Sequence, residues 1–315
     1  MTTENINFDS ILEKYTKQRV NIYKTLELYG SDFVGAIIGE DDLTKRYHEI
    51  LNCGTQLEFV TDNNGITHLK SANFCRQKIC PMCQFRKSEK LFAEMMQVCD
   101  LLGDKYRYLH LVLTLPNAKD GIELVETIKR LYIGFGRFIA YKEIKRAFKG
   151  ALRCLEISYN YDNDTYHPHL HCLIVVNKSY FNDTKVYINY EKMRQLWSKA
   201  CNSEELLQIH IGACKKGDYK GVAEVCKYCL KPLELDEKEK QWQNVNVLLT
   251  LSQILKGQRY VQKYGVIKEA FNVIKERKAG ETFEQVFDKD KKVFYSWDSK
   301  LQKYRKESYN KERFC

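Results

Sequence analysis

The alternation of apolar and polar residues predicts a series of short strands and amphipathic helices along the chain. Where the period is two, we expect strands at 106–115, 152–159, 166–176 and 206–213. Where the period is that of a helix, we expect helices at 7–30, 86–103, 120–148, 189–201, 221–231, 245–255 and 261–275. The long helix at 120–148 contains two glycines, which predict an interruption near Gly134 and Gly136.

The order of these elements predicts the fold class. Between residues 106 and 213 the order is strand, helix, strand, strand, helix, strand. This is the order of a ferredoxin-like split βαβ sandwich, in which an antiparallel sheet carries its helices on one face. We therefore expect an α+β protein with a small zinc-binding module and helical N- and C-terminal parts.

The same pattern divides the chain into four segments. We expect a helical lead-in at 1–50, a zinc-binding module with its following helix at 51–103, the sandwich at 104–233 and a C-terminal helical region at 234–315. The last thirty residues are basic and aromatic. They suit either a DNA-contacting tail or a strand and helix that pack on the core.

The strands at 152–159 and 166–176 form the most informative pattern, an antiparallel hairpin across the turn-rich residues 160–165. On its second strand, His167, His169 and His171 alternate with apolar residues, so the three imidazoles share one face. If the loop is symmetric, Glu156 lies opposite His169. One carboxylate and two imidazoles at an open edge suit a divalent cation that keeps positions for substrate. The alternative is a strand with a few surface histidines.

A compact group of cysteines predicts a second metal site. Cys75, Cys80 and Cys83 lie close together in the sequence, and Cys53 precedes them. Zinc prefers four tetrahedral thiolate or imidazole ligands, and a short Cys-x2-Cys turn presents two of them. We expect a structural zinc ion with these three cysteines and Cys53 as ligands, or with His68 in place of Cys53 as the second choice.

The helix expected at 221–231 ends at Pro232 and carries a carboxylate near a phenol. Glu224 and Tyr228 are four positions apart, so they lie on one face, with Lys227 and Lys231 beside them. Such pairs are common on helices, and the chain has 21 tyrosines. The spacing alone therefore does not single out Tyr228.

The composition limits which partners and which cellular compartment fit the chain. The chain has 51 Lys and Arg against 41 Asp and Glu, and 12% of its residues are aromatic, which fits a polyanion that offers bases for stacking, although such a charge also occurs in ordinary soluble proteins. No apolar run approaches the roughly 20 residues that span a bilayer. The N-terminus lacks the pattern of a secretory signal, and twelve cysteines then favour a reducing compartment. We expect a cytoplasmic protein with no membrane partner.

Four motifs, taken in their order, resemble a known family. They are Asn73–Cys83, Leu111–Asn117, the His-Pro-His-Leu-His run at 167–171, and Glu224–Lys231. This set is similar to the rolling-circle plasmid replication initiators (Rep proteins) of the pC194/pUB110 type from Gram-positive bacteria, which belong to the HUH endonucleases. The similarity extends from about residue 50 to about residue 275.

The resemblance implies a metal-dependent nicking enzyme of the bacterial cytoplasm. Its Mg²⁺ or Mn²⁺ would be held by His169 and His171, with Glu156 as the third ligand, whereas His167 falls where the family varies. Tyr228 would be the nucleophile, and Glu224 would replace the second tyrosine of other initiators. The cysteines that flank Tyr228 depart from the family pattern.

The implied reaction is an attack of Tyr228 on a phosphodiester of the plasmid origin. A phenol has a pKa near ~10, so the attack needs the cation, and Lys227 and Lys231 are candidate phosphate contacts. The products would be a 5′-phosphotyrosine link and a free 3′-OH that primes a host polymerase. Glu224 would activate water and end the cycle after one round.

The expected partners are origin DNA, single-stranded or extruded as a hairpin, together with a host helicase and a DNA polymerase. A homodimer is one alternative for the oligomeric state. Two other functions fit the motifs: a mobilisation relaxase or single-strand transposase with the same chemistry, and a non-catalytic zinc-dependent DNA-binding regulator whose histidines are structural.

Overall fold

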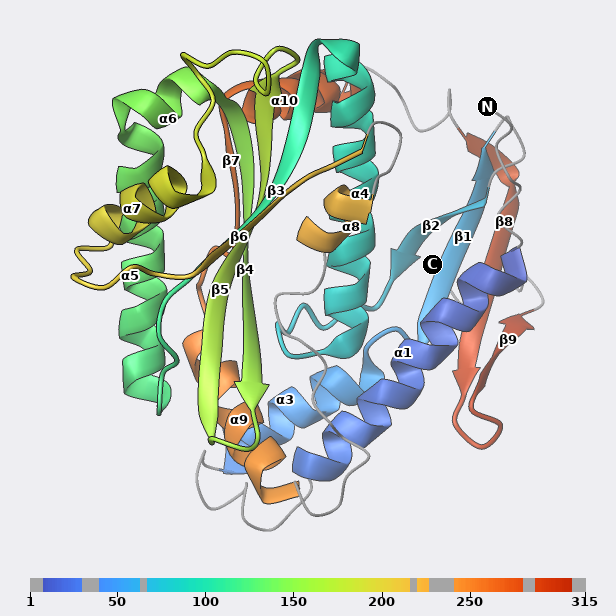
Figure 1. Ribbon diagram of the computed structural model, residues 1–315. Helices are drawn as coiled ribbons and strands as arrows, with labels where there is room; N and C mark the ends of the chain where they lie inside the picture. The colour runs from blue at the N-terminus through green and yellow to red at the C-terminus, as the bar shows by residue number, and fades with distance from the viewer. Residues whose placement is uncertain are drawn as a thin grey trace. The chain divides into compact units, whose positions relative to one another are not determined.

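The computed structural model describes residues 8–29, 40–62, 67–215, 220–226, 241–279 and 287–307. The chain divides into two units, each with its own antiparallel sheet (Figure 1). Unit 1 comprises Met1–Arg86, Leu235–Val245 and Arg277–Cys315, and unit 2 comprises Lys87–Glu234 and Asn246–Glu276. Helices and sheets occur in both, so the α+β class is confirmed. Both units combine segments distant in the sequence, whereas the four segments expected from the sequence are each continuous.

Unit 2 is built on a five-stranded sheet with the order β6-β3-β5-β4-β7. Its strands are β3 (Tyr106–Thr114), β4 (Phe148–Asn160), β5 (Thr165–Asn177), β6 (Ile209–Ala213) and β7 (Val261–Tyr264). β5 lies between β3 and β4 and is antiparallel to both, so β3 and β4 are parallel but not adjacent. This is the split βαβ arrangement that the order of elements predicts.

The sandwich's own helices lie on one face of this sheet, as expected. They are α5 (Gly121–Ala140), α6 (Lys142–Ala147) and α7 (Tyr190–Ala200). The interruption expected near Gly134 is wrong, because α5 continues to residue 140. A Cβ at Gly134 would lie 2.5 Å from the sulfur of Cys201, so this glycine allows close packing at the end of α7.

Three further helices cover part of the other face. These are α4 (Pro81–Leu102), α8 (Lys220–Val225) and α10 (Gly265–Ala279). Their apolar side chains form one core with Leu152 and Cys154 of β4 and Leu173 and Val175 of β5. Further along the same two strands, the alternation places Glu156, His169 and His171 on this face. The candidate metal site thus continues a buried apolar face.

β7 was not expected from the sequence, which predicts the start of a helix at 261. Residues 261–264 instead pair with β4 and add an edge strand to the sheet. The chain turns at Gly265, where φ is +52° and where a Cβ would lie 2.1 Å from the carbonyl oxygen of Lys149. Only glycine fits such an approach. Gly265 therefore allows the turn that ends β7 and starts α10.

Unit 1 contains a four-stranded sheet with the order β2-β1-β8-β9. Its strands are β1 (Gln56–Asp62), β2 (Thr67–Ala72), β8 (Phe287–Asp298) and β9 (Lys303–Glu307). The helices α1 (Phe8–Tyr29) and α3 (Glu40–Asn52) precede β1, and α9 (Gln241–Ile254) begins in this unit. The predicted helix at 7–30 is confirmed. Two roles were left open for the last thirty residues. Their described part forms strands of this sheet, as in the second role, packing on the protein's core.

A buried arginine ties α1 to the end of α3. The Arg19 side chain is 1% exposed, and its guanidinium lies 5.3 Å from the ring centroids of both Tyr23 and Trp297. Its Nη1 donates hydrogen bonds to the carbonyl oxygens of Leu51 and Cys53, both at 2.8 Å. The loop that begins at Cys53 is therefore fixed by a charge-assisted contact from α1.

No helix in the described parts of the chain combines the length and the apolar character needed to cross a bilayer.

Candidate functional site

The hairpin of β4 and β5 has the register expected from its symmetric loop. Glu156 lies opposite His169 in the ladder, which confirms that prediction. Residues 161–164 form the turn, in which the side-chain oxygen of Asn160 accepts hydrogen bonds from the backbone N–H groups of Asp162 and Asn163. This local turn fixes the pairing, and a slip of one residue would send His169 to the opposite face.

The structure brings Glu156, His169 and His171 together. The Nε2 atoms of the two histidines are 3.0 Å apart, and the Glu156 carboxylate oxygens lie 3.7 Å from His169 Nε2 and 3.1 Å from His171 Nε2. Both histidines are 8% exposed. Two imidazole nitrogens and one carboxylate oxygen that converge in this way suit a divalent cation that keeps open positions.

Hydrogen bonds at the other ring nitrogens prepare both imidazoles for a cation. His169 Nδ1 lies 3.1 Å from the carbonyl oxygen of His167, which can only accept, so Nδ1 carries the proton and Nε2 presents its lone pair toward His171 and Glu156. His171 Nδ1 lies 2.9 Å from Nε2 of His110, and the two rings stack with centroids 5.2 Å apart. Such partners orient metal-binding histidines.

Burial also keeps His169 neutral. It lowers the pKa of His169 to about 4, although the charge of Glu156 opposes this shift. Metal binding requires a deprotonated imidazole nitrogen, so protons do not compete for His169 at neutral pH.

His167 lies beside this cluster but is bound elsewhere. Its Nδ1 lies 2.6 Å from the side-chain oxygen of Asn117, on the segment that follows β3. Burial lowers its pKa. His167 is not among the three residues whose ligand atoms converge.

The sequence did not point to His110, Asn117 or His210. His110 and His210 lie on β3 and β6, on the same face as the site, since Val112 pairs with both His171 and His210. The alternation in residues 106–115 places His110 on one face of a strand. It does not tell which strand lies next to it, so only the long-range pairing of β3 with β5 reveals the contact.

We expect His110→Ala to weaken the binding of Mn²⁺ by about 10- to 100-fold, because loss of a partner that orients a metal-binding histidine typically has this effect. Isothermal titration calorimetry on the metal-free protein measures the change. His210→Ala is the matched control, since His210 is exposed and contacts the His110 ring at a centroid distance of 6.4 Å. Equal affinities for wild type and His110→Ala would show that His110 does not orient His171.

Helix α8 lies on the sheet face that carries the site. Its Val222 and Val225 pack against β4 and β5, and a Cβ at Gly221 would lie 3.9 Å from the Cβ of His110. Glu224, on the same helix, is partly buried. Tyr228, Lys227 and Lys231 lie outside the described residues.

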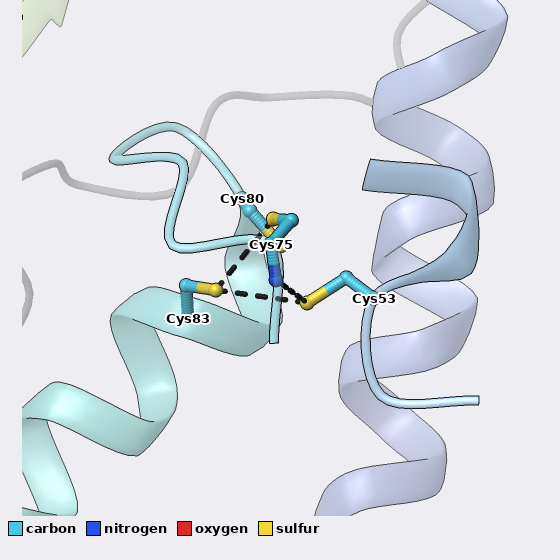
Figure 2. Close-up of side chains that lie close together, drawn as sticks. All are labelled: Cys53, Cys75, Cys80 and Cys83. Carbon is cyan, nitrogen blue, oxygen red and sulfur yellow. Dashed lines mark hydrogen bonds between the residues drawn. The ribbon is translucent and has the colours of Figure 1, made fainter. Parts of the chain in front are cut away.

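The four predicted cysteines also come together, in unit 1 (Figure 2). The sulfur of Cys83 lies 3.6 Å from the sulfurs of both Cys53 and Cys75. Zn–S bonds of about 2.3 Å in a tetrahedron place sulfurs about 3.8 Å apart, so the spacing fits zinc. His68, the second choice for the fourth ligand, instead lies 2.8 Å from the carboxylate of Asp62.

Local backbone structure supports the charge of this cluster. Backbone N–H groups of Cys75 and Arg76 donate hydrogen bonds to the sulfurs of Cys53 and Cys83, at 3.3 and 3.1 Å. Cys83 lies in the first turn of α4, which begins at Pro81, and a helix N-terminus favours a thiolate. Hydrogen bonds from the other thiols lower the pKa of Cys83, and the largest contribution comes from Cys53. Hydrogen bonds with the other thiols, again Cys53 above all, raise the pKa of Cys80.

Comparison with known proteins identifies the family. The model of the replication protein family matches residues 66–305. A "Protein rep" of Staphylococcus aureus is 34% identical over 222 residues, which cover 69% of this chain and 92% of the relative. A "Protein rep" of Bacillus sp is 30% identical over 254 residues, covering 74% and 81%.

A "Protein rep" of Streptococcus pneumoniae serotype 2 is 34% identical over 196 residues, and the chain spans 61% of its length. No solved structure matches the chain. The family match covers both candidate metal clusters except Cys53, together with Glu224 and residues 227–231. The chain therefore belongs to the replication protein family.

Proposed function

We propose that this protein initiates rolling-circle replication of a plasmid by nicking its origin with an HUH-type site. The observation that carries the proposal is the convergence of one Glu156 oxygen and the Nε2 atoms of His169 and His171 on one sheet face. A purely structural pair of histidines has no need of a carboxylate and two oriented lone pairs at one point. A DNA-binding regulator therefore accounts less well for this cluster.

The donor set also bears on the metal. Imidazole nitrogens suit Mn²⁺ and later transition metals better than Mg²⁺, which prefers oxygen ligands. Glu156, His169 and His171 would hold Mn²⁺ more tightly than Mg²⁺, and either ion would draw charge from the non-bridging oxygens of the scissile phosphate. The four cysteines would hold a structural Zn²⁺, since four protein ligands leave no open position.

The remaining steps belong to the protein's own side chains. In the proposed reaction the phenol oxygen of Tyr228 forms a bond to phosphorus, and the bond from phosphorus to the 3′ oxygen breaks. The products are a 5′-phosphotyrosine and a 3′-OH from which a host polymerase extends. Lys227 and Lys231 would neutralise phosphate charge. The substrate is a single-stranded or extruded origin segment, which a host helicase unwinds.

A nicking assay tests this function. Supercoiled plasmid that carries the protein's own gene region is incubated with the protein and Mn²⁺ or Mg²⁺, and denaturing gels reveal protein attached to the 5′ end of the cut strand. We expect cation-dependent nicks with covalent attachment, and more cutting at low Mn²⁺ than at equal Mg²⁺. Nicks without attached protein would contradict a tyrosine nucleophile, and binding without any cutting would favour the regulator.

Glu224→Ala should retain the first nick and lose termination. A carboxylate near the scissile phosphate would act as a general base for water, a contribution of about 10²- to 10⁴-fold. We expect an unchanged initial rate of covalent attachment and an accumulation of products longer than one plasmid length in a replication assay. Glu224→Gln is the matched variant that keeps the size of the side chain. If the first nick is lost as well, the role assigned to Glu224 is wrong.

A further inference from the structure

The loop between β5 and α7 carries three aromatic rings in one cluster. The rings of Tyr180 and Phe181 have centroids 5.2 Å apart, Tyr180 and Tyr187 are 5.4 Å apart, and Phe181 and Tyr187 are 6.4 Å apart. Tyr180 is buried at 2% exposure, whereas Phe181 and Tyr187 are each 48% exposed. Two large rings are thus presented to solvent on a buried third ring.

Hydrogen bonds hold this loop in shape. The hydroxyl of Tyr180 donates to the carbonyl oxygen of Ile188 and accepts from its backbone N–H, at 3.3 and 3.2 Å. The carboxylate of Asp183 accepts from the backbone N–H of Lys185. Because the loop is closed by its own contacts, little conformational entropy remains to be lost when a ligand stacks on the rings.

The loop and the neighbouring helix α6 are rich in basic residues. The guanidinium of Arg146 on α6 donates to the backbone carbonyl of Lys185, which places α6 beside the loop (Figure 1). In α6, the start of β4 and the loop, two acidic residues, Glu143 and Asp183, stand against six basic ones: Lys142, Lys145, Arg146, Lys149, Lys178 and Lys185. Apart from the partly buried Lys149, these basic residues are exposed.

We propose that this surface, formed by α6 and residues 178–187, binds single-stranded DNA. Exposed rings that flank one another offer stacking faces for successive bases, and the lysines and arginine neutralise phosphates. An apolar protein partner fits less well, since the loop and α6 carry six basic residues and two acidic ones. This inference rests on the proposed function in one respect: it takes the bound strand to be plasmid DNA beside the nicking site.

The surface is separate from the candidate nicking site. Residues 178–187 follow the end of β5 at Asn177, and His169 lies eight positions earlier on that strand, about 26 Å away at ~3.3 Å per residue. A strand held at the surface is therefore not the segment being cut but a flanking one. The surface would retain the flanking strand close to the site while the phosphate at the metal cluster reacts.

Fluorescence anisotropy with oligo-dT of about 30 nucleotides tests the proposal, because stacking on such sites tolerates any base. We expect the double variant Phe181→Ala, Tyr187→Ala to bind oligo-dT at least about tenfold more weakly than wild type. Lys185→Glu should reduce the dependence of this affinity on salt concentration. Phe181→Tyr, Tyr187→Phe keeps both rings and should bind as wild type. Ile133→Ala, at another exposed apolar side chain on α5, is the control for lost surface area.

Three results would overturn the proposal: unchanged binding of oligo-dT by the Ala double variant, an equal loss of binding to a blunt duplex, or a loss of self-association in sedimentation with DNA binding intact. The last would make the rings a contact between copies of this chain. Circular dichroism checks that the variant is folded. The double variant should nick a short oligonucleotide that spans only the cleavage site at the wild-type rate. The assay thus distinguishes a loss of DNA binding at the surface from a loss of the nicking reaction.

Discussion

Tyr228→Phe should abolish strand cleavage and covalent attachment and leave the binding of origin DNA and Mn²⁺ intact. The variant keeps the aromatic ring but lacks the oxygen that would bond to phosphorus, so we expect the rate to fall by at least about 10⁴-fold. Mn²⁺ affinity should not change, because the ligand atoms that converge among the described residues come from Glu156, His169 and His171. Quantitative nicking and isothermal titration calorimetry measure both properties on the same preparation.

Two companion variants separate the nucleophile from the cation site. Glu156→Gln keeps the shape of the side chain and removes its charge, so it should lose Mn²⁺ binding together with nicking. Tyr190→Phe removes the phenol oxygen of a 43% exposed tyrosine on α7, which lies on the sheet face opposite the site, and should nick as wild type. If Tyr228→Phe nicks normally, another tyrosine is the nucleophile, and the role carried over from the family is wrong.

If the four cysteines hold zinc as proposed, removal of the ion should unfold unit 1. In small zinc modules the ion supplies about 10 kcal/mol or more of the folding free energy, and Cys83 contacts two of the other three sulfurs. We expect Cys83→Ser to lower zinc affinity by at least about 10³-fold and the melting temperature by ten degrees or more, which metal analysis and differential scanning calorimetry measure.

Cys214→Ser is the matched control for this substitution. Cys214 is a partly buried cysteine of unit 2 that does not belong to the cluster. It should keep one zinc ion per chain and the wild-type melting profile. A zinc content that is unchanged in Cys83→Ser, or zero in the wild-type protein, would contradict the zinc site. His68→Ala should retain zinc, because His68 is paired with Asp62.

The sequence was most informative where the geometry is local. The pairing of Glu156 with His169 followed from one short loop, and the grouping of Cys75, Cys80 and Cys83 followed from a turn and a helix start. The split βαβ order also followed, because each strand and helix has a clear period. In these cases the residues that meet are close in the chain or are ordered by a common supersecondary pattern.

The remainder depends on contacts between distant segments. β1 and β2 were not expected, although Glu58 pairs with Ser71 nearby, because their sheet is completed by β8 from the other end of the chain. His110 meets His171 only through the register of β3 with β5, which no local signal fixes. Edge strand β7 is only four residues long and precedes a helix, so its helical neighbours dominate the pattern.

The mixed origin of the unit 1 sheet has a consequence for protein synthesis. β1 leaves the ribosome long before β8, with which it pairs, and at about 5 to 20 residues per second this delay is roughly 10 to 50 s. The sandwich of β3 to β6 is continuous in the chain and can form during the delay. Throughout that time β1 lacks β8, and the Cys53 loop lacks Trp297, which packs against Arg19. A nascent chain could therefore assemble its candidate nicking site before unit 1 and its candidate zinc site are complete.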